Sequence, residues 1–258
     1  MLSFKNTLVL FAGTVVLAIL ADVLMPLSFW VYVGIVLVFI SILAWGSATI
    51  QSGFYLQSVC SGNRNTRAVA LTFDDGPDGQ VTPMILDVLK EQNVKAAFFI
   101  IGNKAEQFPE VIKRIDAEGH IIGGHSYSHH FFFDLFSRRR TMAEMKRTSD
   151  IVFSITGKRM LLFRPPYGVT NPTLARAIRA MNYTSVGWSL KSNDTVIKDD
   201  DLLLNRLLSN VNKGDIVLFH DNKPWVVKLL KTFIPYLKNK EYSIDRLDKF
   251  ANLHAYVY

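Results

Sequence analysis

Hydrophobic and polar positions divide the chain into an apolar N-terminal part and a longer part of alternating character. Two almost uncharged runs open the sequence, at about residues 7–24 and 29–50, and Pro26 lies between them. Each run is close to the ~20 apolar residues that cross a bilayer as a helix, and proline favours a break in a helix. The pattern predicts a two-helix transmembrane hairpin over residues 1–50, followed by a polar linker over residues 51–66.

Two other interpretations of the apolar runs stay open, namely a cleaved signal peptide and a buried core helix. A signal peptide would account for the first run alone, and its end at residues 18–22 is a poor match to a cleavage site. Lys5, Arg64 and Arg67 flank the hairpin while its loop has no positive charge, so the positive-inside rule places both termini in the cytoplasm. An extracytoplasmic substrate would require the opposite arrangement. The sequence therefore predicts a two-pass membrane protein and leaves the face of its domain open.

Residues 67–258 predict one α/β domain. Short β-rich runs alternate there with stretches whose apolar residues recur at helical spacing. This alternation favours parallel strands joined by crossover helices, and six or seven such units favour a barrel-like sheet. The predicted strands are Ala68–Phe73, Lys95–Ile101, His120–Gly123, Met160–Phe163, Thr184–Trp188 and Asp215–His220. The predicted helices are Pro83–Gln92, Pro109–Glu118, Thr141–Ile155, Pro172–Met181, Asp200–Asn210 and Pro224–Leu237.

Composition limits the function further. The 258 residues carry a formal net charge of +7 and a single cysteine, Cys60, which excludes an internal disulfide framework. The sequence has no zinc-finger spacing, no glycine-rich phosphate loop and no basic region interleaved with aromatic residues, so nucleic acid is not an expected partner. The basic balance suits an anionic membrane or a cell-wall polymer. No obligate protein partner is expected.

Two adjacent carboxylates end the first predicted strand of the domain. Asp74 and Asp75 follow an apolar run and precede a Gly-Pro turn. Neighbouring side chains on a strand point to opposite faces, but a turn directly after Asp75 lets both reach one site. One carboxylate can then bind a metal ion while the other acts as a general base. The structural alternative is a turn that merely closes a strand.

A second motif has the spacing of metal ligands. His125 and His129 follow two glycines, and histidines at i and i+4 meet on one face of a helical turn. Two histidines alone are more often structural. With Asp75 they form a three-ligand set that leaves positions free for water and substrate, which is typical of catalytic metal sites.

Further polar residues follow predicted strands. Arg164 precedes a double proline and Tyr167; it is interpreted as orienting a carboxylate, with the Tyr167 N–H fixed towards the substrate. The alternative for the Arg164 motif is a turn that merely ends a strand. The alternative for His220 is a histidine with a structural place in the core. Chemistry in barrel folds gathers at the carboxyl ends of strands, which predicts one pocket. The residues just after a predicted strand are Asp74, Asp75, His125, Arg164, Trp188 and His220.

The chain resembles the polysaccharide deacetylase family, also known as carbohydrate esterase family 4 or the NodB-homology domain. The resemblance covers about residues 68–220 and rests on four motifs in the family's order. They are Asp-Asp-Gly-Pro at 74–77, His-Ser-x-x-His at 125–129, Arg-Pro-Pro-Tyr-Gly at 164–168 and Leu-x-His at 218–220. It implies a distorted (β/α)7 barrel that removes N-acetyl groups from amino sugars of glycans such as peptidoglycan or chitin. The implied cofactor is one divalent ion, zinc first, with cobalt, nickel or manganese as alternatives.

The resemblance also implies a role for each matched residue. Asp74 is the general base, and Arg164 holds it in position. His220 is the general acid, and Asp194 tunes it. The implied metal ligands are Asp75, His125 and His129. The implied substrate-binding residues are Tyr167, whose N–H stabilises the oxyanion, Leu218 in the acetyl pocket, Pro166 and Trp188.

One family motif is altered in this chain. The family often has Asp-x-x-Asp-Trp after the sixth strand, and here Lys191, Asp194 and Thr195 stand at the three named positions. The reaction type is therefore better defined than the substrate. A lipid-linked amino sugar that loses a formyl or acetyl group is an alternative substrate, and a catalytically silent glycan-binding module is an alternative function.

The segment Phe131–Arg140 has two interpretations. Four phenylalanines and a leucine precede three consecutive arginines. They can form a turn packed on the barrel, since aromatic residues usually mark a core. Alternatively, they form a rim in contact with lipid, with the arginines at headgroup phosphates. In that case Phe132 and Phe136 are the expected lipid contacts.

Overall fold

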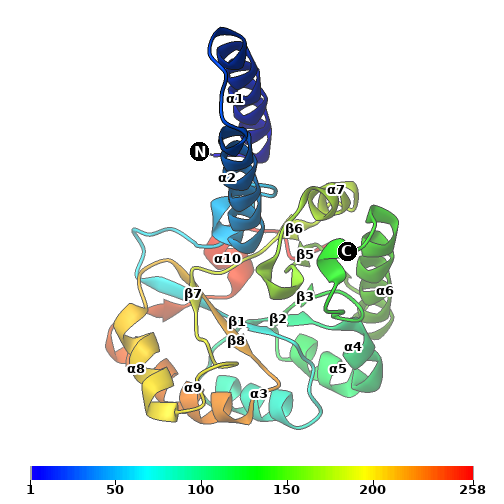
Figure 1. Cartoon of the computed structure of the whole chain (residues 1–258). Helices are drawn as coiled ribbons and strands as arrows, with labels where there is room; N and C mark the ends of the chain where they lie inside the picture. The colour runs from blue at the N-terminus through cyan, green and yellow to red at the C-terminus, as the bar shows by residue number, and fades with distance from the viewer. Residues whose placement is uncertain (1, 258) are drawn as a thin grey trace.

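The computed structural model, described over residues 2–257, consists of an α-helical hairpin and an α/β domain (Figure 1). The hairpin comprises α1 (Phe4–Leu24) and α2 (Phe29–Ala48). Both helices are long and apolar enough to cross a membrane, and only 11% and 6% of their apolar windows are buried. Such low burial disfavours the core-helix interpretation, because a helix that is hydrophobic all round lies inside a protein or a membrane. A signal sequence at the N-terminus passes the same length test.

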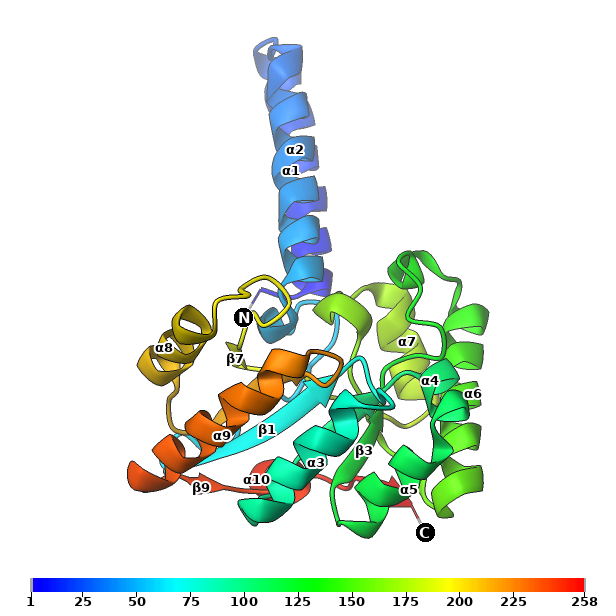
Figure 2. The same cartoon turned by 90° about the horizontal axis from the view of Figure 1, so that it is seen from below.

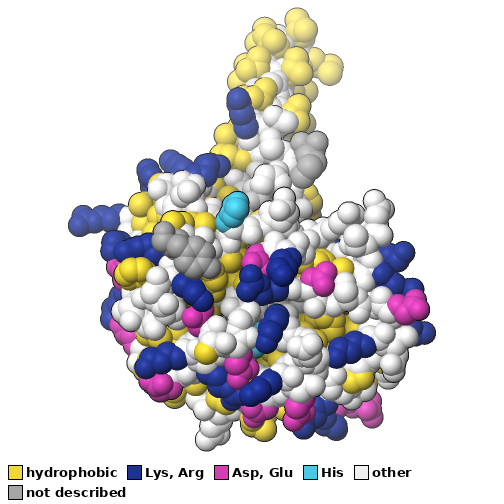
Figure 3. Space-filling model, turned by 180° about the vertical axis from the view of Figure 1, so that it is seen from behind, with side chains coloured by type: hydrophobic (Ala, Val, Ile, Leu, Met, Phe, Trp, Pro, Cys, Tyr) yellow, Lys and Arg dark blue, Asp and Glu magenta, His cyan; other side chains and the backbone are white. Residues whose placement is uncertain are grey.

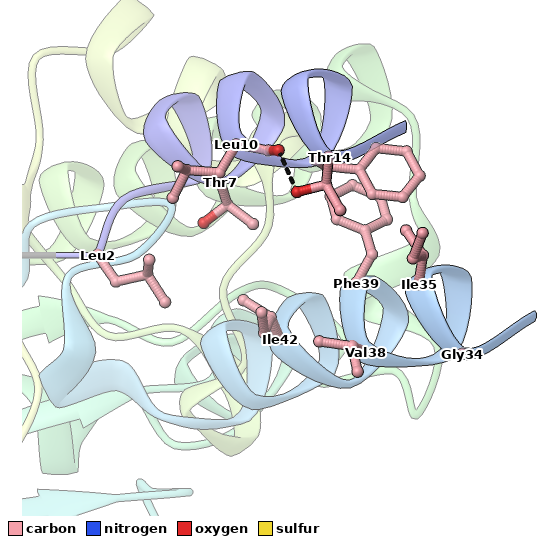
Figure 4. A pocket seen from close by; sticks show the side chains of 10 residues that line it. Leu2, Thr7, Leu10, Thr14, Gly34, Ile35, Val38, Phe39 and Ile42 are labelled. Carbon is pink, nitrogen blue, oxygen red and sulfur yellow. Dashed lines mark hydrogen bonds between the residues drawn. The ribbon is translucent and has the colours of Figure 1, made fainter. Parts of the chain in front are cut away.

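A cavity of about 340 Å³ lies between the two helices, as Figure 4 shows. Phe11 stacks on Phe39 with ring centroids 4.0 Å apart, and the Thr14 hydroxyl donates to the Leu10 carbonyl at 2.9 Å. None of the residues that line this cavity is titratable. Hydrophobic side chains follow the hairpin, whereas charged side chains are spread over the domain (Figure 3). The cavity between the helices therefore offers no acid, base or metal ligand.

The domain is built on a parallel sheet that curls into an incomplete barrel. Its strands are β1 (Ala68–Asp74), β2 (Ala97–Ile100), β3 (Ile121–Gly124), β5 (Leu162–Phe163), β6 (Thr184–Ser185), β7 (Leu190–Lys191), β8 (Asp215–His220) and β9 (Ser243–Ile244). The order is β6-β5-β3-β2-β1-β8-β7, and β9 pairs with the beginning of β1. Central β1 is buried along its whole length, as expected for a parallel strand covered on both faces. The register pairs Asp74 with His220 on β8, so polar residues at two neighbouring strand ends lie side by side.

Helices cover the outside of the sheet (Figure 2). They are α3 (Val81–Glu91), α4 (Gly102–Gln107), α5 (Pro109–Ala117), α6 (Arg138–Thr156), α7 (Pro172–Ala180), α8 (Asp200–Asn210), α9 (Pro224–Asn239) and α10 (Leu247–Ala251). A small antiparallel sheet joins β4 (Arg159–Met160) to β10 (Tyr256–Val257). Aromatic side chains form much of the core between sheet and helices: Phe73 stacks on Phe98 at 4.9 Å and on Phe219 at 5.7 Å.

The prediction of an α/β distorted barrel is confirmed. Each predicted strand and helix of the domain has a counterpart, with ends that shift by a few residues. The elements that the pattern missed are short: α4, α10 and the two-residue strands β7, β9 and β10. Elements of that length show no hydrophobic period. Seven strands make up the curled order, and within residues 2–257 its two ends, β6 and β7, do not pair.

Residues 51–66, which follow the hairpin, lie against the domain. Val59 forms a bridge with Val186, and Ser61 forms one with Asp215. Phe54 is buried, and a short 3-10 helix, η1 (Ile50–Ser52), follows α2 almost directly. Packed side chains and backbone bridges therefore set the position of the hairpin on the domain.

Candidate active site

Two carboxylates reach one cavity because the backbone turns between them. Asp74 is the last residue of β1, and Asp75 follows with a φ of +71°. This left-handed conformation interrupts the strand alternation that would separate the two side chains. The next residue is glycine: a Cβ on Gly76 would lie 2.0 Å from Oδ2 of Asp221. Lys104 fixes the turn from the other side, since its Nζ donates to the Asp75 carbonyl at 2.7 Å.

Asp75, His125 and His129 form a three-residue cluster with metal-binding character. Their ligand atoms all lie within 4.8 Å of one another. Oδ1 of Asp75 is 3.3 Å from Nε2 of His129 and 3.7 Å from Nε2 of His125. The backbone between the histidines is not the expected helical turn but a loop, with a φ of +66° at Ser126 and +46° at His129. Hydrogen bonds, such as that from the His129 N–H to the Ser126 hydroxyl at 3.0 Å, hold this loop.

The protonation of this cluster suits a divalent ion. Nδ1 of His125 lies 2.7 Å from the Arg164 carbonyl, so it carries the proton and leaves Nε2 free to face the cavity. Burial, together with the charge of His125, lowers the pKa of His129 to about 4. Although burial raises the pKa of Asp75, the charges of the two histidines lower it overall. A neutral imidazole and an ionised carboxylate are the forms that bind metals, so the residues present fit such an ion.

Arg164 is buried behind Asp74 and makes four hydrogen bonds. Nη1 donates to Oδ1 of Asp74 at 2.8 Å and to the Thr72 hydroxyl at 2.9 Å. The other donors reach the carbonyls of Val186 at 3.3 Å and Gly187 at 2.7 Å. Arg164 is fully buried and Asp74 is 3% exposed, so water does not screen this pair. The guanidinium therefore fixes the orientation of Asp74.

His220 lies at the end of β8, next to a second buried acid. Nδ1 of His220 is 2.6 Å from Oδ1 of Asp194, and the His220 backbone N–H donates to Oδ2 at 2.8 Å. Burial alone lowers the pKa of His220, but the hydrogen bond and charge of Asp194 outweigh it and raise this pKa. The Trp225 indole N–H donates to the Asp194 carbonyl at 3.0 Å and anchors the loop. Nε2 of His220 is thus free for a substrate, while Nδ1 is held.

A cavity of about 240 Å³ contains most of the predicted residues. Arg164 and Asp194 lie beneath its wall, fully buried, and Pro166 is buried without lining it. Tyr167, half exposed with a φ of +59°, places its hydroxyl 3.3 Å from Nδ1 of His129. The predicted residues that line the cavity are Asp74, Asp75, His125, His129, Tyr167, Trp188, Leu218 and His220. Lys191, Thr195 and Gly168 complete the lining.

Two features of the site were not predicted. Asp221 packs under the Asp75 turn, and its Oδ2 accepts a 2.7 Å hydrogen bond from the Thr82 hydroxyl. Burial raises the pKa of Asp221 to about 7. The only feature of the sequence that could have indicated Asp221 as part of the site was its position directly after His220. Gly168, with a φ of +69°, lets the Trp188 ring approach to 2.4 Å from the position of a Cβ, a contact that spacing along the chain does not reveal.

Comparisons with known proteins agree with this geometry. A family model described as polysaccharide deacetylase matches residues 61–186. A peptidoglycan-N-acetylglucosamine deacetylase of Bacillus cereus is 38% identical over 70% of this chain and 66% of its own length. The peptidoglycan-N-acetylglucosamine deacetylase PgdA of Listeria monocytogenes is 34% identical over 72% of this chain. The matched segment spans only 39% of that relative.

A solved structure extends the match to three dimensions. The Bc1960 peptidoglycan N-acetylglucosamine deacetylase superposes with a TM-score of 0.73 at 35% identity. The superposition covers 77% of this chain and 94% of that structure. Sequence, fold and site geometry agree, and the chain belongs to the polysaccharide deacetylase family.

Proposed function

We propose that the chain is a membrane-tethered, metal-dependent hydrolase that removes N-acetyl groups from amino sugars of peptidoglycan. One observation carries the proposal: the cluster of Asp75, His125 and His129 lies in the same cavity as Asp74 and His220. Arg164 binds Asp74 from behind, and Asp194 binds His220. Two relatives bear the name peptidoglycan-N-acetylglucosamine deacetylase. Asp74, Asp75, His125, His129 and His220 together supply what amide hydrolysis needs, which a silent binding module has no reason to keep.

The chemistry divides between the two sides of the cavity. A divalent ion at the Asp75 cluster would polarise the acyl carbonyl and lower the pKa of water; zinc suits a set of two imidazoles and one carboxylate. Asp74, held in position by Arg164, accepts the proton of the attacking water. The water oxygen then bonds to the acyl carbon.

His220 acts on the leaving group. The carbon–nitrogen bond breaks while Nε2 of His220 donates a proton to the sugar nitrogen, giving acetate and a free amine. An amine is a poor leaving group unless it is protonated, so the raised pKa of His220 serves this step. Leu218, Trp188 and Tyr167 line the cavity, and we assign the acetyl and sugar contacts to them. The Tyr167 N–H is the proposed oxyanion donor, and Pro166 supports that turn.

The direct test is acetate release by the full-length protein from N-acetylglucosamine oligomers and from peptidoglycan, with metal content measured on the same preparation. We expect about one divalent ion per chain, release that a chelator abolishes, and loss of both metal and release in Asp75→Asn. The matched control is Asp201→Asn, an exposed carboxylate in the first turn of α8. A folded protein with neither metal nor acetate release would refute the proposal and favour a glycan-binding module.

A second substrate is supported by the charges around the hairpin. Lys5, Arg64 and Arg67 flank the two helices. Under the positive-inside rule these charges support a cytoplasmic domain, which would favour a lipid-linked amino sugar. Reporter fusions at the C-terminus decide between the two. A domain on the extracytoplasmic side of the membrane fits peptidoglycan as the substrate, whereas a domain on the cytoplasmic side fits the lipid-linked amino sugar.

A further inference from the structure

The loop between His129 and α6 exposes large apolar side chains beside the cavity mouth. Phe131 is 72% exposed, Phe132 52% and Leu135 74%. Phe131 lies against Tyr167, which lines the catalytic cavity, with ring centroids 6.3 Å apart. Contiguous apolar exposure of this kind marks an interaction surface rather than ordinary surface variation.

Two other aromatic side chains of the same loop point inward and fix it. Phe133 and Phe136 are buried; Phe133 lies 6.4 Å from Phe163 of β5 and 5.6 Å from Phe136, between ring centroids. Phe136 is therefore not available as the lipid contact that the sequence suggested, whereas Leu135 is exposed, as Phe132 is. The outward residues are held out by a buried anchor, so their exposure is a property of the fold.

Three consecutive arginines, residues 138–140, follow the loop and form the first turn of α6, where a positive charge is unfavourable for the helix. α6 begins at Arg138, and its first turn contains no acidic residue. Cations are unfavourable at a helix N-terminus because the macrodipole is positive there. Arg140 stacks on Phe136 at 3.5 Å, while Arg138 and Arg139 are exposed. This charge arrangement suits an external anionic surface, which attracts basic residues that lie near it.

The hairpin is attached to the wall of the same cavity. Ser47 and Thr170 exchange two hydrogen bonds: the Thr170 N–H donates to the Ser47 carbonyl at 3.0 Å, and the Ser47 hydroxyl donates to the Thr170 carbonyl at 2.7 Å. Gln51 Nε2 donates to the Trp188 carbonyl at 2.9 Å. Gln51 lies six positions after Trp45, which is in the last turn of α2, and six positions of α-helix rise about 9 Å. The cavity wall thus lies within about 10 Å of the level where α2 would leave a bilayer.

The loop rises to the same side of the domain as the hairpin. Figure 2 shows the loop that precedes α6 at about the level of the base of α1 and α2, with the segment that leads into α7 between them, on the side where the strands end. A bilayer that surrounds the hairpin would lie on this side of the domain. Aromatic and aliphatic side chains with adjacent arginines are typical of contacts at a membrane interface.

We propose that Phe131, Phe132 and Leu135, with Arg138 and Arg139, form a second membrane contact that seats the catalytic mouth on an anionic lipid surface. The inference rests on the tethering part of the proposed function. The hairpin fixes one point of the domain at the bilayer and the loop fixes another. The mouth between them faces substrates held at the membrane surface.

The test measures the depth of single nitroxide labels in the full-length protein, in a Cys60→Ser background. The protein is reconstituted in vesicles of phosphatidylethanolamine with phosphatidylglycerol. Labels are placed at Leu135→Cys, at Val38→Cys in α2, and at Met84→Cys. Met84 is the matched control, an exposed apolar residue of α3. Figure 1 shows α3 at the end of the domain away from the hairpin. Accessibility to oxygen is compared with accessibility to a water-soluble nickel chelate.

We expect an oxygen-to-nickel ratio several-fold higher at residue 135 than at residue 84, and highest at residue 38. Adding Arg138→Gln and Arg139→Gln should lower the ratio at residue 135 only. A lipid signal at residue 38 with a fully aqueous residue 135 would overturn the inference and leave the tether standing. If residue 135 responds to soluble N-acetylglucosamine oligomers and not to the bilayer, the loop is a glycan platform and the inference fails. Labels need no turnover, so this result is independent of the deacetylase activity.

Discussion

Replacing Asp194 with asparagine tests whether the acid beneath the cavity controls His220. The carboxylate accepts two hydrogen bonds from His220, one from Nδ1 at 2.6 Å and one from the backbone N–H at 2.8 Å. An asparagine of the same shape offers one oxygen and one amide group, so one of the two donors faces another donor. The Asp194→Asn side chain also has no charge to stabilise a protonated imidazole.

The magnitude follows from these contacts. A hydrogen bond to a charged group contributes about 1.5–3 kcal/mol, and 1.36 kcal/mol corresponds to one unit of pKa. The pKa of His220 should therefore fall by about one to two units. The protonated form donates the proton, so activity is present below the His220 pKa and is lost as the pH rises through it. Because Asp194 raises this pKa, its removal should move the alkaline limb of the kcat/KM profile to lower pH. At neutral pH we expect a loss of about 10- to 100-fold.

The assay is acetate release between pH 5 and 10, with thermal unfolding recorded for each protein. Asp201→Asn, the exposed carboxylate of α8, should leave both the limb and the rate unchanged. If Asp194→Asn lost activity by one factor at every pH, with the limb unmoved, Asp194 would be a structural residue only. The argument from its hydrogen bonds to the pKa of His220 would then be refuted.

Three other substitutions and treatments test the rest of the site. Arg164→Lys should lower the free energy of unfolding by about 3 kcal/mol or more, because a buried pair loses its geometry and buried carbonyls lose their donors; denaturant titration measures this, and a loss below about 1 kcal/mol would contradict it. Gly76→Ala should weaken metal binding, since its Cβ would lie 2.0 Å from Oδ2 of Asp221 and displace the turn that holds Asp75; calorimetric titration with zinc measures the affinity, and an unchanged Kd would show that the turn adjusts. Removing the metal with a chelator should lower the Tm of the unmodified protein, because a ligand that binds only the native state stabilises that state. The Asp75→Asn protein should show no further fall in Tm when the chelator is added. An equal fall in Tm in both proteins would place the ion elsewhere.

The fold was predictable because its longer elements carry strong local signals. β1 and β8 are continuous apolar runs, and α8 has the same bounds as predicted, with Asp199 as its N-cap, accepting from the Leu202 N–H at 2.8 Å. The two-residue strand β7 gave no period, so its position beside β8 came only from the structure. Local pattern decides long elements, whereas tertiary pairing decides short ones.

The site was predictable as a set of residues but not as a geometry. The motifs named Asp75, His125 and His129, but a helical turn was expected where the chain forms a loop with positive φ at His129. Backbone conformations of this kind are rare for residues other than glycine and leave no pattern in a sequence. Likewise, Pro166 stands in a cavity motif yet is buried outside the lining, because the turn presents Tyr167 instead.

Arg164 links distant parts of the barrel as well as Asp74. It follows β5, reaches Thr72 and Asp74 on β1, and binds the carbonyls of Val186 and Gly187 after β6. The Arg164 side chain thus connects β5, β1 and the segment after β6 across the interior of a sheet whose end strands, β6 and β7, do not pair. The residue that orients Asp74 therefore also stabilises the barrel. Evolution of new substrate preference is thereby constrained at this position. It is freer at Lys191 and Thr195, which line the cavity without bracing it, and there the chain differs from the family's usual motif.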